Sequence, residues 1–277
     1  MNYFNSQIGF GTAGLADRQD SAWWNIGKKA LHTAIEVGYT VFDTAEMYGD
    51  GKSETMIGEV LAETAKRNQL HIVTKILPKN ATSKTSIIDS CCASIQRMNC
   101  DYIDTYLLHW REGNQPLQPI VEAFLELQQQ GLIKKYGVSN FDTSRSLLEW
   151  ASYERHIGTQ EHIVANQVHY SLSKRAPEDK LIKLHETMNI TMMAHSPLIT
   201  ASNKPRNNIL NNNNFFKLAE KYNYNPAQLA IAWTVRNPGV IAIPRSIQPK
   251  HIEDNFTASK LVLDAGILAE LDQLFPV

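Results

Sequence analysis

Short apolar runs alternate with amphipathic stretches along almost the whole chain. Residues 39–43 form one such run, ending in Asp43, and apolar positions with a period near 3.6 residues precede it, from Ser21 to a break at Gly38. Continuous apolar runs are typical of parallel strands buried on both faces, whereas the 3.6-residue period is typical of helices that cover them. The pattern predicts strands that each lead into a helix.

This alternation is repeated eight times. Strands are expected at residues 8–12, 39–43, 70–75, 102–109, 133–138, 163–168, 190–194 and 240–243. Helices are expected from Ser21, from about Ser53, and at residues 82–98, 119–130, 143–153, 176–189, 226–236 and 250–256. Strict alternation favours a parallel sheet, and eight units favour its closure. We therefore predict the α/β class and a (β/α)8 TIM barrel, as a single domain over residues 1–277.

Composition narrows the functional classes. Hydrophobic residues make up 43% of the chain and charged residues 20%, with a formal net charge of -1. Without a long Lys/Arg cluster the chain lacks the positive surface that nucleic acids require, so no nucleic-acid partner is expected. No signal peptide and no apolar run near the roughly 20 residues of a membrane span are found, so we expect a cytoplasmic protein. The three cysteines lack metal-ligand spacing, which predicts reduced thiols and no metal site.

One segment of low complexity, NNILNNNN at residues 207–214, follows the seventh expected strand. Polar loops of this kind are typical of flexible connections on the protein surface. A flap over a ligand is the alternative.

Polar side chains stand where the expected strands end. They are Asp43 with Tyr48, Lys75, His109, Ser139 with Asn140, Gln167, His195 with Ser196, and Arg245 with Ser246. In a closed barrel the carboxyl ends of all strands meet at one rim, which is where such enzymes place their active sites. The sequence therefore predicts a site at that rim.

Four of these residues suit the reduction of a carbonyl group. A phenol with an ordinary pKa of about 10 is a weak acid unless a cation stabilises its anion, and Lys75 could supply that cation for Tyr48. Asp43 could pair with the ammonium group and fix it. His109 could hydrogen-bond and orient a carbonyl oxygen. Such a group can protonate an oxygen while hydride reaches the carbon.

From Gly9 to about Phe256, the chain resembles the aldo-keto reductase family. The motifs that carry the resemblance are GFGTA at 9–13, GYTVFDTAEMYG at 38–49, IVTK at 72–75, DYIDTYLLHW at 101–110, GLIKKYGVSNF at 131–141, NQV at 166–168, SPL at 196–198 and IPRS at 243–246. The resemblance implies a β/α barrel that reduces aldehydes or ketones by direct hydride transfer. Its expected partner is a small carbonyl substrate, and its expected state a monomer or weak oligomer.

The resemblance also implies roles for individual residues. The catalytic group would be Asp43, Tyr48, Lys75 and His109, with Tyr48 as proton donor, and Trp110 would be a wall of the substrate pocket. The cofactor-binding residues would be Gly11, Thr12, Ser139, Asn140, Gln167, His195, Ser196, Leu198, Arg245, Ser246, Asp254 and Asn255. Within this set, Arg245 and Ser246 match positions that meet the adenosine 2′-phosphate. Because an arginine suits a phosphate dianion, NADPH is expected, with NADH possible.

Four departures from the family pattern bear on the cofactor and the pocket. His195 stands where a tyrosine commonly stacks on the nicotinamide, and His251 where an arginine often assists the 2′-phosphate. Ala13 replaces a common pocket-lining tryptophan, and no long C-terminal loop is seen before Val277. The last two features favour an open pocket.

Other assignments compete with this one. Residues 9–14 fit the dinucleotide motif G-x-G-x-x-G, but no helix is expected directly after them, as a Rossmann fold requires. Tyr48 and Lys52 fit Y-x-x-x-K, yet glycines separate them. Lys75 could instead form a Schiff base, as in class I aldolases, although Asp43 would keep its amine charged. A cofactor-binding regulatory subunit with little or no turnover is the non-enzymatic alternative.

Overall fold

The eight strands form a closed parallel barrel. The computed structural model describes residues 2–18, 20–198 and 209–277, and in it the strands follow one another around the sheet in chain order. They are β1 (Phe10–Gly11), β2 (Val41–Asp43), β3 (His71–Ile76), β4 (Ile103–Leu108), β5 (Ile133–Ser139), β6 (Ala165–His169), β7 (Thr191–His195) and β8 (Val240–Ile243). The Ile8–Ala242 bridge, and a 3.1 Å hydrogen bond from the Gly11 N–H to the Pro244 carbonyl oxygen, join the last strand to the first.

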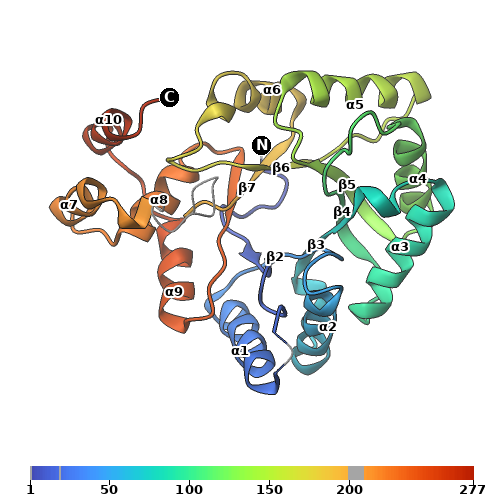
Figure 1. Cartoon of the computed structure of the whole chain (residues 1–277), viewed down its shortest axis with the longest axis horizontal. Helices are drawn as coiled ribbons and strands as arrows, with labels where there is room; N and C mark the ends of the chain where they lie inside the picture. Colours follow the sequence, from blue (N-terminus) through green and yellow to red (C-terminus); the bar gives the residue numbers. More distant parts are fainter. Residues whose placement is uncertain (1, 19, 199–208) are drawn as a thin grey trace.

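Helices surround the strands, as Figure 1 shows. They are α1 (Ser21–Val37), α2 (Lys52–Thr64), α3 (Lys84–Arg97), α4 (Gln118–Gln129), α5 (Ser144–Ile157), α6 (Leu181–Met188), α7 (Asn213–Lys221), α8 (Pro226–Thr234), α9 (Pro249–Ala258) and α10 (Ala265–Leu274). None of the described helices is both long and apolar enough to cross a membrane. The predicted (β/α)8 barrel is confirmed.

Helix α1 illustrates how the sequence sets the element boundaries. The Asp20 side chain accepts a 2.7 Å hydrogen bond from the Trp23 N–H, which satisfies one of the free donors of the first turn. Gly38 ends the helix in the left-handed region, with φ of 112°. The glycine-rich segment at residues 9–14 is thus separated from α1 by a loop, which excludes the Rossmann arrangement.

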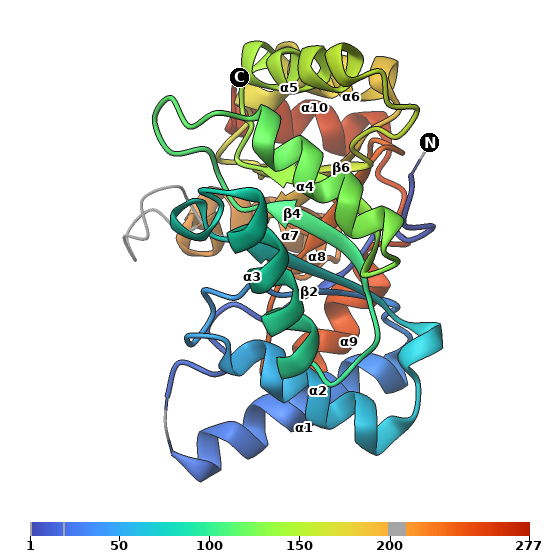
Figure 2. The ribbon, with the colours of Figure 1, turned by 90° about the vertical axis from the view of Figure 1, so that its right-hand side faces the viewer.

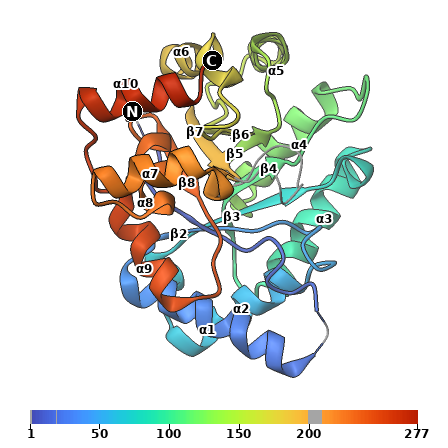
Figure 3. The ribbon, with the colours of Figure 1, turned by 60° about the vertical axis from the view of Figure 1, so that its left-hand side comes forward.

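Two helices, α7 and α10, were not predicted from the sequence. The side chain of Asn212 accepts hydrogen bonds from the backbone of Asn214 and Phe215 and so caps α7. Within the surface connection expected at residues 207–214, residues 209–214 form a 3-10 turn (Ile209–Asn211) and the start of α7; residues 207–208 lie outside the described part. Figure 3 shows α7 beside α8, with α10 next to them.

The helix expected at residues 176–189 is shorter than predicted. A 3-10 turn, Ala176–Glu178, contains Pro177, and α6 begins only at Leu181. The interruption lies at Lys180, whose backbone departs from helical geometry with φ of -140° and ψ of -27°. Pro177 is not the cause, because proline is tolerated in the first turn of a helix.

The amino end of the barrel is closed by an apolar plug. The interior is filled by Val41, Val73, Leu107, Ala165, Met193, Ile241 and Ile243, and Phe4 packs against them with 6% of its surface exposed. The Phe4 ring lies 4.9 Å from that of His71, which starts β3, and 5.2 Å from that of Tyr3. In Figure 2 this N-terminal segment lies on the right, opposite the loop between β4 and α4.

Candidate active site

A buried ion pair lies at the carboxyl end of the barrel. Lys75, in β3, places its Nζ 2.8 Å from Oδ1 of Asp43, the last residue of β2. The same Nζ donates to the Thr44 carbonyl oxygen at 2.7 Å, and Lys75 has no exposed surface. Burial favours the neutral amine, but the negative charge of Asp43 and the interactions with Asp43 and Tyr48, including a hydrogen bond to each, outweigh burial and raise the pKa of Lys75. The lysine is therefore an ammonium ion at neutral pH.

Tyr48 lies directly against this pair. The Lys75 Nζ is 3.4 Å from the phenol oxygen and 5.0 Å from the centre of the ring. Burial raises the pKa of Tyr48, and the nearby ammonium lowers that pKa by a smaller amount. The pKa of Tyr48 is therefore raised overall. The lowering expected from Lys75 is present, but it is smaller than the effect of burial. The phenol keeps its proton at neutral pH.

The turn that carries Tyr48 is wedged between its neighbours. Gly49 and Gly51 both have positive φ, at 59° and 82°. A Cβ atom on Gly49 would lie 2.8 Å from the Ala16 carbonyl oxygen, and one on Gly51 would lie 2.6 Å from Cδ of Arg97. Arg97 is itself held by a 2.6 Å ion pair with the buried Glu54. Only glycine fits at these two positions, and little room remains for the turn to shift.

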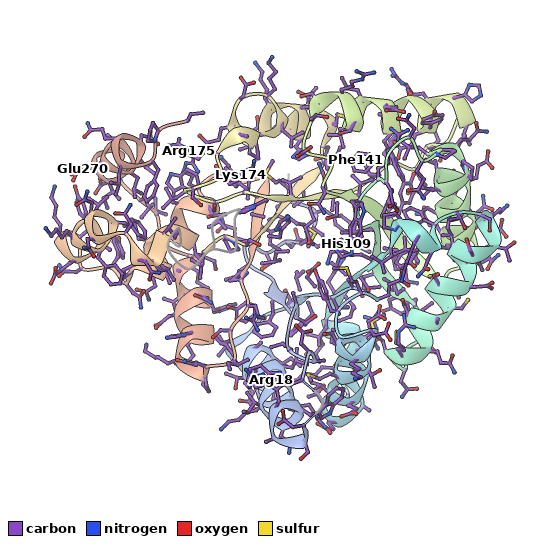
Figure 4. The ribbon with its side chains drawn as sticks, viewed as in Figure 1. Arg18, His109, Phe141, Lys174, Arg175 and Glu270 are labelled. Carbon is purple, nitrogen blue, oxygen red and sulfur yellow. The ribbon has the colours of Figure 1, made fainter. Side chains whose placement is uncertain are left out.

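His109 follows β4 and faces Tyr48 across the rim. The two ring centres are 5.9 Å apart, and the Trp110 ring is 4.8 Å from that of His109. Burial, followed by the charge of Lys75 and a contribution from the neighbouring His195, lowers the pKa of His109 to about 3, so its ring is neutral. Among the described residues its Nδ1 has no hydrogen-bond partner. Figure 4 shows His109 near the middle of the ring of helices.

Gln167 connects the far side of the barrel to the ion pair. Its Nε2 donates a 2.6 Å hydrogen bond to Oδ1 of Asp43, although the two residues are 124 positions apart in the chain. The sequence pointed to Gln167 as a cofactor-binding residue and gave no sign of this contact. Asp43 is thus held by Gln167 as well as by Lys75.

A cavity of about 400 Å³ opens above these residues. The predicted site residues that line it are Gly11, Asp43, Tyr48, His109, Trp110, Ser139, Asn140, Gln167, His195, Ser196, Leu198 and Arg245. Two predicted residues lie behind its wall. Lys75 is fully buried, and the Thr12 hydroxyl donates to the Asp43 carbonyl oxygen at 3.0 Å.

A second hollow of about 270 Å³ shares Leu198 and Arg245 with the first. It is lined by Ser246, Asp254 and Asn255, so the structure brings the remaining predicted residues to one place. Its wall also includes Phe216, from the unpredicted helix α7, with 49% of its surface exposed. Sequence reasoning missed Phe216 because the asparagine-rich segment before it concealed the helix.

Arg245 is the cation between the two hollows. Within residues 2–18, 20–198 and 209–277 it makes no ion pair and no hydrogen bond, and it is exposed. By contrast, Lys250 on α9 is paired with Asp254 at 2.7 Å. An unpaired guanidinium group at the edge of a cavity is suited to bind a phosphate or carboxylate.

The chain belongs to the Aldo/keto reductase family, which residues 7–275 match. Among its relatives, "Methylglyoxal reductase YeaE" of Escherichia coli (strain K12) is 36% identical over 247 residues, which cover 89% of this chain and 84% of that protein. "Methylglyoxal reductase DkgB" of Escherichia coli O157:H7 is 31% identical over 261 residues, covering 93% and 88%.

Solved structures agree with this assignment. An aldo/keto reductase from Klebsiella pneumoniae in complex with NADP and acetate superimposes with a TM-score of 0.87 at 36% identity, covering 98% of this chain and 91% of that one. An aldo-keto reductase from the same organism in complex with NADPH gives a TM-score of 0.87 at 35% identity, with the same coverage. The protein is therefore an oxidoreductase of this family.

Proposed function

We propose that this protein reduces aldehydes or ketones to alcohols, with NADPH as the hydride donor. The observation that carries the proposal is the buried Asp43–Lys75 pair, whose ammonium lies 3.4 Å from the Tyr48 phenol oxygen beneath the cavity. Family membership and the NADP-containing Klebsiella structures support it.

The four rim residues divide the proton chemistry between them. The nicotinamide, when bound, supplies hydride to the carbonyl carbon. Tyr48 holds a proton at neutral pH and gives it to the carbonyl oxygen, and Lys75 then stabilises the phenolate that remains. Asp43 keeps Lys75 charged. His109, as a neutral ring, hydrogen-bonds the carbonyl oxygen and orients it.

The residues of the two hollows fit the dinucleotide. Ser139, Asn140 and Gln167 offer amide and hydroxyl groups at the end nearest Tyr48, where the nicotinamide carboxamide would be held. Arg245, unpaired, would take the 2′-phosphate together with Ser246. Asp254 and Asn255 would meet the adenine. This distribution favours NADPH over NADH.

We further propose that the substrates are small. Both relatives named above are called methylglyoxal reductases, and Trp110 and Leu198 are among the apolar side chains that line the cavity. Short 2-oxoaldehydes are therefore the first compounds to test, followed by other aldehydes, ketones and sugars.

The test is NADPH oxidation, followed by absorbance, by the wild type and by Tyr48→Phe. The variant lacks the proton donor, so turnover is expected to fall by at least about 100-fold, while affinity for NADPH changes little. An active Tyr48→Phe enzyme would refute the assignment of Tyr48. Tight NADPH binding by the wild type without turnover of any carbonyl would favour the regulatory-subunit alternative.

The Schiff-base alternative has a test of its own. A protonated, fully buried Lys75 cannot act as a nucleophile, so borohydride in the presence of a carbonyl substrate is expected to leave Lys75 unmodified. A covalent adduct at Lys75, found by mass spectrometry, would contradict the reductase mechanism.

A further inference from the structure

A chain of hydrogen bonds crosses the rim between β4 and β7, and its centre is Asn140. The Asn140 Nδ2 donates to the His109 carbonyl oxygen at 2.8 Å, and the Asn140 backbone N–H donates to the Gln167 carbonyl oxygen at 2.7 Å. On its other side, the Asn140 Oδ1 lies 3.3 Å from Nε2 of His195. The side-chain amide is therefore held from both ends.

These contacts fix which nitrogen of His195 carries the proton. Because Oδ1 of Asn140 can only accept, Nε2 of His195 must be the donor. Nδ1 is then an acceptor, and the Ser196 hydroxyl, 3.1 Å away, donates to it. Burial lowers the pKa of His195 to about 3, with smaller contributions from the neighbouring His169 and Lys75, which keeps the ring neutral. Both ring nitrogens have partners.

The backbone at both ends of this chain adopts an unusual conformation. Asn140 and Ser196 each follow the last residue of a strand, and each has positive φ, at 58° and 56°. Such a conformation has a cost for a residue other than glycine, although the cost is smaller for asparagine, and it persists where neighbouring contacts favour it. The turns after β5 and β7 direct Asn140 and His195 toward one another at the cavity wall.

We propose that His195 is a positioning residue, whose Nε2–H holds the Asn140 side chain so that its oxygen faces the cavity with one lone pair available to a carboxamide. This inference rests on the proposed function, because the ligand it serves is the nicotinamide end of the cofactor. It differs from a stacking role for the His195 ring, since the essential group is a hydrogen-bond donor.

Two substitutions separate the donor from the ring. His195→Gln retains an N–H donor and loses the aromatic ring, whereas His195→Phe retains a ring and loses the donor. Dissociation constants for NADPH are measured by fluorescence titration of each purified variant. Loss of one hydrogen bond corresponds to roughly fivefold weaker binding, so we expect about this loss for His195→Phe and less than about twofold for His195→Gln. Equal losses, or none for His195→Phe, would overturn the proposal.

Binding of 2′,5′-ADP, the adenosine half of the cofactor, serves as the control. It is expected to be unchanged in both variants, which shows that they are folded and that the defect lies at the nicotinamide end. A wild type that binds neither ligand would contradict the proposed function, not the role of His195 alone.

A measurement on the wild type decides the question independently of how the variants fold. Nitrogen-15 NMR of the histidine side chains distinguishes the two neutral tautomers, with His195→Gln used to assign the signal. The proposal requires the Nε2–H tautomer for His195 at neutral pH. The Nδ1–H tautomer, or a charged ring, would overturn it.

Discussion

The two ends of the barrel are built from different kinds of side chain. At the amino end, Phe4 and Tyr3 pack on His71 and close the interior with apolar surface. At the carboxyl end, Asp43 and Lys75 bring opposite charges into a site with almost no exposed surface, beneath an open cavity. Burial of charge has a cost in stability, whereas burial of apolar surface contributes to stability. The difference fits the proposal that the carboxyl end performs the chemistry, while the amino end stabilises the fold.

The largest expected effect is that of removing the charged pair as a unit. In the Asp43→Asn/Lys75→Met double variant neither charge is left buried alone, so we expect stability within about 1 kcal/mol of the wild type. Carbonyl reduction should nevertheless fall by about 1000-fold, because the group that stabilises the Tyr48 phenolate is lost. Urea unfolding and NADPH oxidation measure the two effects. A large loss of stability would mean that the pair holds the barrel together.

The converse substitution is Phe4→Ala at the amino end. Truncating a buried phenylalanine leaves a cavity, and we expect the free energy of unfolding to fall by about 3 kcal/mol. Turnover at 25 °C should remain within about twofold of the wild type, because Phe4 is at the other end of the strands from Tyr48. Phe4→Leu, which fills more of the space, is the matched control and should be less destabilised. A catalytic defect in a folded Phe4→Ala protein would break the comparison.

Arg245→Ala tests, within the carboxyl end, whether cofactor binding can be changed separately from the chemistry proposed for Tyr48. We expect the dissociation constant for NADPH to rise by about 20-fold, as for loss of a charged hydrogen bond to phosphate, and that for NADH to change by less than about twofold. Arg155→Ala, an exposed arginine at the end of α5, is the control. Equal losses for the two cofactors would show that Arg245 does not meet the 2′-phosphate.

The smallest expected effect is the contribution of His71 to the loss of stability at acid pH. Burial, partly offset by Asp104, lowers the pKa of His71 to about 4, whereas the unfolded chain protonates this ring near 6.5. Between these values the unfolded state binds the extra proton, so stability falls as the pH falls. We expect the loss between pH 7 and pH 5.5 to be about 1 kcal/mol smaller in His71→Gln than in the wild type. Identical losses would mean that His71 does not titrate in this range.

The polar residues predicted at the ends of the strands meet around one cavity, while the sequence pattern missed part of the fold. The strands that carry Asp43, Lys75 and His109 have strong apolar patterns, and closure of a barrel brings their ends together without further information. Helix α7 was missed because its cap, Asn212, lies within a run of asparagines that resembles a loop. Helix α10 was missed because it follows the eighth strand–helix unit, after which no further element was expected.

Side-chain contacts across the barrel could not be predicted from the sequence. The hydrogen bond from Gln167 to Asp43 depends on the rotamers of two side chains brought together by closure, and no local pattern encodes it. The direction of the Tyr48 pKa shift could not be predicted either, because it too depends on how the folded chain packs. The charge of Lys75 could be foreseen, but the larger effect of burial depends on how the turn at residues 45–51 packs.

The tightly packed turn that carries Tyr48 becomes ordered when the chain folds, before any substrate binds. Because Gly49 rests on Ala16 and Gly51 on Arg97, the conformational entropy of this segment is lost once, when the chain folds, and not again in each catalytic cycle. The proposed proton donor is then already in place when a carbonyl compound arrives, and this turn needs no further ordering during turnover.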